Sequence, residues 1–359
     1  MATATNYDHA ASAIRRPGRE GREPVLDTKE LVRLATLAAC SHNTQPWKFC
    51  IHGHSVTVLP DFARRCPVVD PDDGHLFKSL GCAAENLVQA AAAQGYATDV
   101  AFDSSVEVVV ARFTPSASVR ASDLFRAIPR RQCTKTVYDG TALTSEQVEL
   151  IAQAGHGAGV RAIVLAERPQ LDAITEYVTC GNQAQLSDAA FRNELTAWLR
   201  FNPGEALRTG DGLCGRTTGR PSLPTWLGKL CIGLVLAPTS QSNADVNNIR
   251  SSGALVVFVA ARDDKQMWVE VGRAYERVAL QIAALDLRSA FVNQPIEVRA
   301  LRPQLEAWLG LRGEHALLII RVGRAPLAPF SLRRPIDDVI ITTERDHSPA
   351  RKDPGLVAG

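Results

Sequence analysis

Apolar residues recur along much of this chain at the spacing that places them on one face of a helix. The clearest run predicts a helix over residues 266–285, whose apolar face comprises Met267, Val271, Ala274, Val278, Ile282 and Leu285. A second long helix is predicted to begin at Asp73 or Gly74 and to end before Gly95. Weaker periodicity predicts further helices over residues 27–40, 143–154, 170–178, 187–201 and 298–309.

Short alternating or β-branched segments between these helices predict strands. They cover residues 47–51, 55–59, 106–113, 160–165, 254–260, 289–292 and 315–322. The first two flank a turn at Gly53 and predict a β-hairpin. Residues 254–260 are nearly all apolar, which predicts a central strand buried on both faces. Because helices alternate with strands throughout, the chain is expected to fold as a mixed α and β protein.

Three segments lack such periodicity. Residues 1–26 are polar and aperiodic, so we expect an extended or mobile arm. Residues 202–229 are rich in Gly, Pro, Ser and Thr, a composition that is typical of a long surface excursion or lid. The tail beyond Arg333 is expected to be extended and then frayed.

The overall composition narrows the function classes. The chain has 359 residues, enough for two or three domain-sized units, with 45% hydrophobic and 22% charged residues. Forty Lys and Arg residues against 38 Asp and Glu leave a net charge of +2, which is too balanced for a chain that mainly binds a polyanion. We therefore expect no nucleic-acid partner.

The cysteines and the apolar runs predict the cellular setting. The eight cysteines form no CxxC pair and lack the dense spacing of secreted, disulfide-rich proteins. No segment reaches 18 consecutive apolar residues, and the arginines near the N-terminus are not followed by an apolar run. We therefore expect reduced thiols, no membrane partner and a cytoplasmic location.

Familiar cofactor and catalytic signatures are absent from the sequence. Gly155, Gly157 and Gly159 imitate a dinucleotide-binding fingerprint, but a predicted helix precedes them and a strand follows. The fingerprint requires the reverse order, because the phosphate binds at the N-terminus of the helix that follows the glycines. No P-loop, HExxH or GxSxG motif occurs either.

Two clusters contain possible metal ligands. His52 and His54 flank the predicted hairpin turn without further ligands, so a solvated turn explains them better. Asp70, Asp72 and Asp73 precede the second long helix without the spacing of a calcium loop, which favours helix capping. We therefore expect no metal site.

A polar stretch, Ser41-His42-Asn43-Thr44-Gln45-Pro46-Trp47, lies between a predicted helix and a predicted strand. Its hydroxyl, amide and indole groups suit a neutral polar ligand, but a turn that satisfies its own polar groups explains them equally well. The stretch resembles the SxxNxQPWxF signature of the FMN-dependent nitroreductase family, and the match continues to Phe49. The resemblance implies an FMN-binding role for Ser41, Asn43, Gln45 and Trp47.

A second segment, Arg131-Gln132-Cys133-Thr134-Lys135, is similar to the R-x-S-x-[RK] segment of the same family. The resemblance implies that Arg131 approaches the FMN phosphate, Cys133 the ribityl chain and Lys135 the pyrimidine edge of the flavin. Cys133 stands where serine is usual, which weakens one expected hydrogen bond to the ribityl chain. Taken alone, the segment would be explained by a basic surface turn.

Two further segments fit the family pattern. Pro295-Ile296-Glu297 resembles the P-I-E turn whose backbone N–H groups face flavin N5, and it lies between the helix at 266–285 and the strand at 315–322, as in the family. Gly323-Arg324 and Arg333-Arg334-Pro335 resemble the cationic C-terminal ending that completes the phosphate pocket. A doubled arginine is otherwise commonly a solvated surface feature.

The motifs are distributed as in two fused nitroreductase-like halves. Ordinary family members are homodimers whose site combines elements of both subunits. Here the helix at 143–154 is followed by glycines instead of the polar set, and the segment 14–19 looks like a decayed first copy of 130–135. This pattern is similar to the Acg-like branch of the family. It implies an α+β fold, a nitroreductase-like three-layer α/β/α sandwich, in which two halves form a single-chain pseudo-dimer with one FMN site.

The expected organisation follows from this comparison. It comprises an N-terminal arm over 1–26, a first, reduced half over 27–120, a second half over 121–340 with a lid insertion at about 202–230, and a C-terminal tail over 341–359. A fused pair already contains the interface that the family forms between subunits. A monomer or a weak homodimer is therefore expected.

The resemblance implies an FMN-binding oxidoreductase that transfers electrons from NAD(P)H or another reductant to an organic acceptor such as a nitroaromatic or a quinone. Two alternatives remain open. The chain could store FMN beneath a closed lid with little turnover, or it could be a flavin-dependent dehydrogenase or oxidase of a biosynthetic intermediate. In the oxidoreductase, a fixed cation at Lys135 would stabilise the reduced flavin. No side chain is assigned as catalytic.

Overall fold

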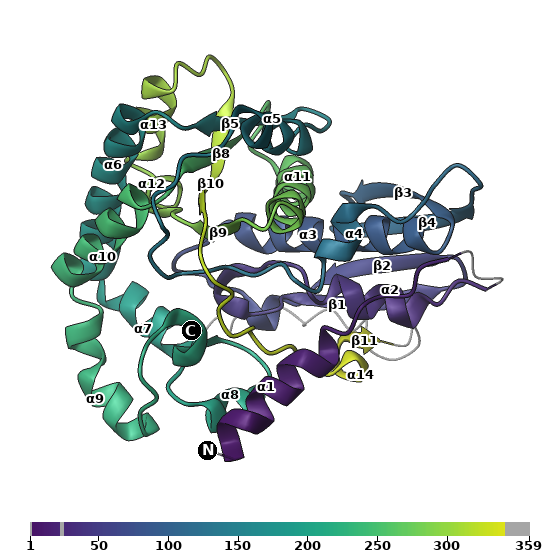
Figure 1. The fold of residues 1–359 in the computed structure, drawn as a ribbon, viewed down its shortest axis with the longest axis horizontal. Helices are drawn as coiled ribbons and strands as arrows, with labels where there is room; N and C mark the ends of the chain where they lie inside the picture. Colours follow the sequence, from purple (N-terminus) through teal and green to yellow (C-terminus); the bar gives the residue numbers. More distant parts are fainter. Residues whose placement is uncertain (1, 22–24, 342–359) are drawn as a thin grey trace, which may run out of the picture.

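Two sheets that share a core of four antiparallel strands in the same order organise the molecule (Figure 1). The computed structural model describes residues 2–21 and 25–341. In the first sheet, β1-β2-β4-β3 comprise Trp47–His52, Ser55–Pro60, Val108–Pro115 and Tyr96–Asp103. In the second sheet, β5-β8-β10-β9 comprise Val160–Leu165, Ala254–Ala260, His315–Gly323 and Arg288–Phe291. In both sheets the first two strands in sequence are neighbours, and the fourth lies between the second and the third.

The helices repeat the same order. A helix precedes each sheet, namely α2 (Thr28–Ala35) and α5 (Ser145–Ala154), and a 20-residue helix follows the second strand, namely α3 (Gly74–Ala93) and α11 (Lys265–Ala284). The structure therefore consists of two halves of like topology. The α+β class and the fused two-half arrangement expected from the sequence are confirmed.

The two long helices pack directly against each other at the junction of the halves. A Cβ atom at Gly81 of α3 would lie 2.0 Å from the Val269 carbonyl oxygen, and one at Gly272 of α11 would lie 1.9 Å from that of Lys78. Each glycine is the eighth residue of its helix. The contact is thus reciprocal, as expected for a pseudo-twofold axis that passes between the helices.

The second sheet has helices on both faces. Val256, Phe258 and Ala260 of β8 belong to the large core that includes α3 and α11. The alternate residues of β8 face a second core formed with α6 (Arg168–Ser187) and α13 (Arg302–Trp308). Every residue of β8 is buried, so the predicted central strand is confirmed. This half has the three layers expected of an α/β/α sandwich.

The prediction of an extended or mobile arm over residues 1–26 is wrong for residues 2–14, which form a packed helix. Residues Ala2–Ile14 form α1, and Tyr7 is only 1% exposed. Together with Ala11, Tyr7 packs in a small apolar cluster against Ala206 and Leu332. These partners lie about two hundred residues or more away in sequence, so local periodicity could not reveal them.

The 202–230 excursion contains more regular structure than expected. It holds α8 (Pro203–Thr209), a short strand β7 (Leu213–Cys214), the single-turn η3 (Gly215–Thr218) and the start of α9 (Thr225–Val235). β7 pairs in parallel with β6 (Leu199–Arg200), which follows α7 (Ala189–Ala197). Further elements that the sequence did not predict are β3, α4 (Asp123–Ala127) and α10 (Pro238–Arg250). We call residues 199–235 the lid.

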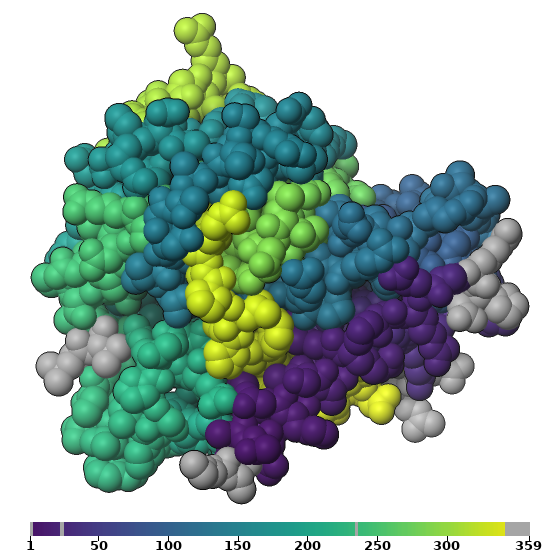
Figure 2. Space-filling model, viewed as in Figure 1, coloured from purple at the N-terminus to yellow at the C-terminus, as the bar shows by residue number. Residues whose placement is uncertain are grey.

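Near its C-terminal end the chain returns to the first half. The predicted helix at 298–309 is confirmed only over the seven residues of α13, and a separate short helix, α12 (Gln294–Glu297), precedes it. After β10 the chain crosses the junction of the halves, as Figure 2 shows in yellow, and forms α14 (Ile336–Val339) and β11 (Ile340–Ile341). β11 extends the first sheet beside β1. The expected C-terminal tail begins at residue 341, and its remainder, 342–359, lies outside the described residues.

Among the described helices, none combines the length and the hydropathy that a membrane span requires. Within residues 2–21 and 25–341, no group of three or more His, Cys, Asp or Glu side chains is arranged to hold a metal ion. Asp70 is a helix-capping residue, since its carboxylate accepts hydrogen bonds from the backbone N–H groups of His75 and Leu76 in the first turn of α3.

Candidate functional site

A cavity of about 600 Å³ lies where the two halves meet the lid. The lid contributes Leu213, Thr217 and Leu223 to its wall. Of the twelve residues expected to bind FMN, the cavity brings together Ser41, Asn43, Arg131, Cys133, Lys135, Glu297 and Arg333. The other five, Gln45, Trp47, Pro295, Ile296 and Arg334, do not line it.

The turn that begins the polar stretch has an unusual backbone. Ser41–Asn43 form the single-turn helix η1, and His42, Asn43 and Gln45 have φ angles of 49°, 55° and 54°. Few residues other than glycine adopt positive φ, because Cβ approaches the backbone closely there. Such conformations concentrate at functional sites, where surrounding contacts maintain them. Here the contacts that maintain the turn come from the lid and the C-terminal segment.

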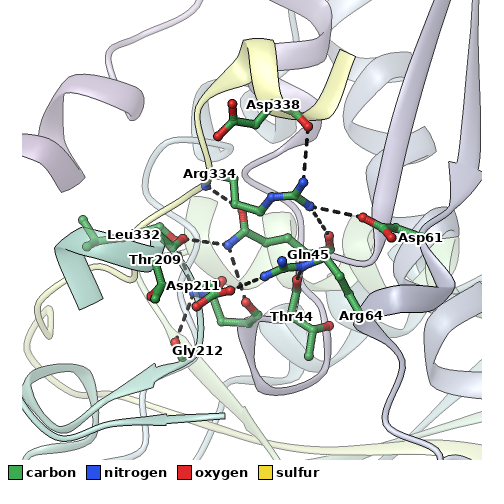
Figure 3. A network of polar contacts seen from close by, with 12 residues as sticks. Thr44, Gln45, Asp61, Arg64, Thr209, Asp211, Gly212, Leu332, Arg334 and Asp338 are labelled. Atoms are coloured by element: carbon green, nitrogen blue, oxygen red, sulfur yellow. Dashed lines mark hydrogen bonds and ion pairs between the residues drawn. The ribbon is translucent and has the colours of Figure 1, made fainter. Parts of the chain in front are cut away.

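Asn43 and Gln45 form those contacts, and Figure 3 shows Gln45 among its partners. The Gln45 amide donates to the Gly210 carbonyl at 2.9 Å and accepts from the backbone N–H of Arg334 at 2.8 Å. Asn43 Nδ2 donates to the carbonyls of Gly212 and Leu332, each at 3.2 Å. The two amides therefore bind protein groups in this structure. Sequence reasoning expected them to bind the ligand.

Three of the remaining expected residues are in contact with other protein groups, either in an apolar core or in a polar network. Trp47 is fully buried in the large core, and Ile296 belongs to the second core. Arg334 lies in the network of Figure 3, where its guanidinium is 3.6 Å from the Asp61 carboxylate and donates to the Gln45 carbonyl at 3.3 Å. Arg64 and Arg200, which lies in the lid, both pair with Asp211 nearby. This network joins the lid, the η1 turn and the C-terminal segment.

Three arginines line one part of the cavity: Arg15 and Arg131, which are buried, and Arg333, which is half-buried. Arg131 forms an ion pair with Glu276 of α11, at 3.0 Å between Nε and Oε1. Arg333 donates to the carbonyls of residues 36–38 at the end of α2 and to Asn43 Oδ1. Arg15 donates to two backbone carbonyls, at residues 129 and 131. We call these three side chains the arginine cluster.

The arginine cluster has an excess of positive charge. Among the described residues, Glu276 is the carboxylate within ion-pair distance of it, and Arg15 and Arg333 have no acidic partner. Burial, with the repulsion of Arg131, lowers the pKa of Arg333 to about 10. Burial lowers the pKa of Arg15 as well, and the charges of Arg333 and Arg131 add to that effect. The cluster would therefore be stabilised by an anion.

A second polar group lies elsewhere on the cavity wall. His75 Nε2 is 3.3 Å from Glu297 Oε1, and Gln185 Nε2 donates to Glu297 Oε2 at 2.6 Å. Despite burial, which acts to raise it, the pKa of Glu297 is lowered by these two partners and by His42. Burial lowers the pKa of His42 to about 4, and the nearby cation of Lys135 acts in the same direction. His42 is therefore neutral at pH 7.

Sequence reasoning missed several residues of the cavity wall. Arg15 was interpreted as part of a decayed motif, although the structure places it beside Arg131. His75 and Lys78 lie on the buried face of α3, and no local pattern distinguishes them from core positions. Burial lowers the pKa of Lys78 to about 8. Only the packing of α3 against the second half brings these two side chains to the cavity.

Comparison with known proteins adds an independent observation. The chain is 26% identical over 325 residues to a Mycobacterium tuberculosis (strain H37Rv) protein provisionally named NAD(P)H nitroreductase Rv3131, covering 87% of this chain and 90% of that protein. The corresponding protein of strain CDC 1551, MT3217, matches equally well. The chain is thus similar to these two proteins over most of its length. The resemblance expected from the sequence is therefore confirmed, whereas the Acg-like branch stays a prediction.

Two solved structures also match, with TM-scores below 0.5. The FMN-dependent nitroreductase NfnB of Mycobacterium smegmatis, solved with NADPH, has 14% identity and a TM-score of 0.42, covering 62% of this chain and 98% of that one. An FMN-bound nitroreductase of Desulfitobacterium hafniense has 11% identity and a TM-score of 0.39, covering 62% and 99%. No protein-family profile matches the chain.

Proposed function

We propose that this chain is an FMN-dependent oxidoreductase that takes electrons from NAD(P)H and passes them to an organic acceptor such as a nitroaromatic or a quinone. The observation that carries the proposal is the arginine cluster, in which three guanidinium groups, two of them buried, have one carboxylate among them at the wall of a cavity of about 600 Å³. The names of the two mycobacterial relatives point to the same class of reaction.

The residues present fit FMN. Arg15 Nε is buried without a hydrogen-bond partner, and Arg333 bonds only to neutral oxygen atoms. A phosphate group would accept a hydrogen bond from Arg15 Nε, and it would supply the negative charge that Arg333 lacks among its present partners. The cavity volume also lies within the range of about 300–1,000 Å³ that is typical of cofactor sites. Arg15, Arg131 and Arg333 would hold the phosphate.

The protein's own residues would position the flavin and shape its electrostatics. FMN supplies two-electron transfer when it is bound. Lys135 and Cys133 line the same cavity, where a cation at Lys135 would stabilise negative charge on a reduced ring. The lid forms part of the cavity wall through Leu213, Thr217 and Leu223. His42 contributes a neutral imidazole to this wall at pH 7, because its pKa is about 4.

The role of Lys135 can be tested alone. Lys135→Ala is expected to weaken FMN binding or to lower the flavin's reduction potential, because a nearby cation favours the reduced, anionic ring. FMN titration and reduction against a reference dye measure the two quantities. Lys48→Ala removes an exposed lysine whose Nζ donates to the Asp338 carbonyl, and it serves as the control. If both quantities stay at the wild-type value in Lys135→Ala, Lys135 has no such role.

The first experiment is an absorption spectrum of the FMN-reconstituted protein before and after anaerobic NADPH or NADH. Flavin bands that bleach, and return when a nitroaromatic or quinone is added, are the expected result. Failure to retain FMN after reconstitution would remove the proposed site.

A storage protein is the second candidate. The contacts of Asn43 and Gln45 with the lid favour it, since they hold the lid against the η1 turn. Flavin bands that persist in the presence of NADPH and NADH would support storage, or a dehydrogenase or oxidase that is reduced by its own substrate. Bleaching by a biosynthetic intermediate would then separate these two.

A further inference from the structure

One wall of the cavity is built from hydrogen-bond acceptors, and the proposed function gives it no role. Asn182 of α6, Asp245 of α10 and Gln294 of α12 converge there. Asp245 Oδ2 accepts from Asn182 Nδ2 at 2.9 Å and from Gln294 Nε2 at 3.1 Å. Figure 1 shows α6, α10 and α12 together on one side of the molecule, whereas α1, α2 and α4 lie on the other. We call these three side chains the acceptor wall.

The orientation of both amides follows from the carboxylate. An ionised aspartate only accepts hydrogen bonds, so each amide must turn its NH₂ group toward Asp245. Gln294 Nε2 also donates to Asn182 Oδ1 at 3.2 Å, which fixes the same orientation independently. As a consequence, Gln294 Oε1 is left buried without a hydrogen-bond partner. In the described residues Asp245 Oδ1 has no hydrogen-bond donor either.

The charge of Asp245 is unpaired as well. The residue is only 8% exposed, and no Lys, Arg or His among the described residues lies within ion-pair distance of it. Buried carboxylates are normally paired, because an isolated buried charge is costly. Asp70 is also buried without an ion pair, but it accepts backbone N–H groups at the positive end of a helix. Asp245 lies within α10 and has only amide donors.

The lid places Arg220 near this wall. Gln241 of α10 donates from Nε2 to Asp245 Oδ2 at 3.2 Å, and Arg220 donates to Gln241 Oε1 at 3.5 Å. Arg220 is exposed and lines the cavity, and it interacts with the charge of Asp245 without forming an ion pair with it in the described part of the chain. Gln294 Oε1 and Asp245 Oδ1 therefore lack a hydrogen-bond donor in the described residues, and the Asp245 carboxylate lacks a cation in contact with it.

We propose that Asp245, supported by Asn182 and Gln294, selects an electron acceptor that carries an N–H-donating cation such as a primary ammonium or amidinium group. This inference rests on the proposed function, since it names the substrate class for the same cavity. An ammonium group would pair with the Asp245 carboxylate and supply the missing donor. An acceptor substrate bearing a carboxylate would be repelled at the same place.

Calorimetric titration of the FMN-reconstituted protein with three matched nitroaromatics tests the proposal, namely 4-nitrobenzylammonium, 4-nitrobenzyl alcohol and 4-nitrobenzoate. Without NAD(P)H no turnover occurs, so binding is measured alone. Wild type is expected to bind the ammonium compound at least about tenfold more tightly than the alcohol, and the benzoate more weakly than either. Asp245→Asn should reduce the ammonium-to-alcohol ratio to about one, because the new NH₂ group replaces an acceptor by a donor.

Two further variants complete the experiment. Arg220→Gln removes an exposed cation and should strengthen ammonium binding, which keeps the test informative if Asp245→Asn fails to fold. Asp172→Asn is the matched control, because Asp172 is half exposed on α6 and its nearest basic atom, Arg250 Nε, is 3.9 Å away. It should leave the ratio unchanged.

The outcomes separate this proposal from the proposed function. Wild type without a preference for the ammonium compound, or a preference that persists in Asp245→Asn, overturns the acceptor-wall proposal and leaves the FMN site intact. If the protein does not bind FMN, the proposed function fails. In that case the three nitroaromatics are titrated into the flavin-free chain. The ammonium-to-alcohol affinity ratio in wild type and in Asp245→Asn then decides the role of Asp245.

Discussion

At the scale of single residues, the cavity is defined by charges that the fold does not neutralise. Arg333 is the clearest case, since its five donors contact backbone carbonyls and one amide oxygen rather than a carboxylate. Asp245 at the acceptor wall is a negative charge whose partners are amide groups and not a cation. Because burial of an unpaired charge is unfavourable, each of them indicates a ligand group of opposite sign.

Replacement of Arg333 tests the phosphate end. Arg333→Met is expected to weaken FMN binding about 10- to 100-fold, because a hydrogen bond to a charged group contributes about 1.5–3 kcal/mol. Binding of riboflavin, which lacks the phosphate, should change little. Fluorescence titration of the flavin-free protein with both ligands measures the difference. An equal loss for FMN and riboflavin would show that Arg333 does not contact the phosphate.

His42 should make the flavin-free protein less stable in mild acid. Its pKa is lowered from 6.5 to about 4 in the folded state, so the unfolded chain binds the proton more tightly. The stability from neutral His42 is complete above pH 6.5 and is lost as the pH falls toward 4, by up to about 3 kcal/mol.

Urea unfolding between pH 7 and pH 4 measures this effect. His42→Asn should flatten the dependence, since asparagine tolerates the positive φ at this position but does not titrate. His52→Asn, at the exposed hairpin tip, should retain the wild-type slope. A slope that is the same in His42→Asn and wild type would contradict the assignment.

At the scale of elements, the α3–α11 crossing joins the two halves. The lid belongs to the second half in sequence and also contacts the η1 turn of the first half. The crossing depends on glycine, because the helix backbones approach too closely for a Cβ atom at Gly81 or Gly272. The lid depends on side chains from α1, the η1 turn and the segment after β10. The cavity therefore lies between elements that are far apart in sequence.

Gly81→Ala and Gly272→Ala should each destabilise the protein by about 3 kcal/mol or more, because the added methyl group would overlap a backbone carbonyl of the other helix. Gly233→Ala on α9 is the matched control, since a Cβ there has no atom within 4 Å. It is expected to stabilise the helix by up to about 1 kcal/mol. Thermal unfolding of the three variants measures the difference, and equal effects would contradict the close crossing.

At the scale of the whole molecule, the two halves are alike in topology but not in chemistry. Glu276 is the twelfth residue of α11 and pairs with Arg131, whereas Glu85, the twelfth of α3, pairs with Arg273 and Arg277. The guanidinium of Arg277 also donates to the carbonyls of Ala154 and His156 at the end of α5. In the second half, Arg277 therefore binds the carbonyl groups at the end of α5, which correspond to those that Arg333 binds at the end of α2 in the first half.

We therefore expect one FMN per chain. Titration of the flavin-free protein with FMN, followed by the flavin absorbance retained after gel filtration, measures the ratio. Arg277→Ala should leave the ratio at one, because the polar set of the η1 turn has no counterpart after α5. Two equivalents of FMN in the wild type would show that the second half also binds the cofactor.

Much of the fold follows from local pattern alone. The apolar period of α11, the all-apolar β8 and the hairpin β1–β2 are each encoded within about twenty residues, because backbone geometry converts spacing directly into a buried face. The expected site residues Ser41, Arg131 and Lys135 could likewise be named from short motifs, and the cavity includes them.

Tertiary structure decided the rest. The burial of α1 and the positions of Arg15, His75 and Asp245 on the cavity wall depend on partners far away in sequence, which no periodicity records. For the same reason, the amides of Asn43 and Gln45 could be named from their motif while their partners in the lid could not. The sequence alone determined which elements form and which side chains are chemically able to bind a flavin. Packing of the two halves and the lid decided which of them meet, because charge and hydrogen-bond satisfaction depend on distance in space.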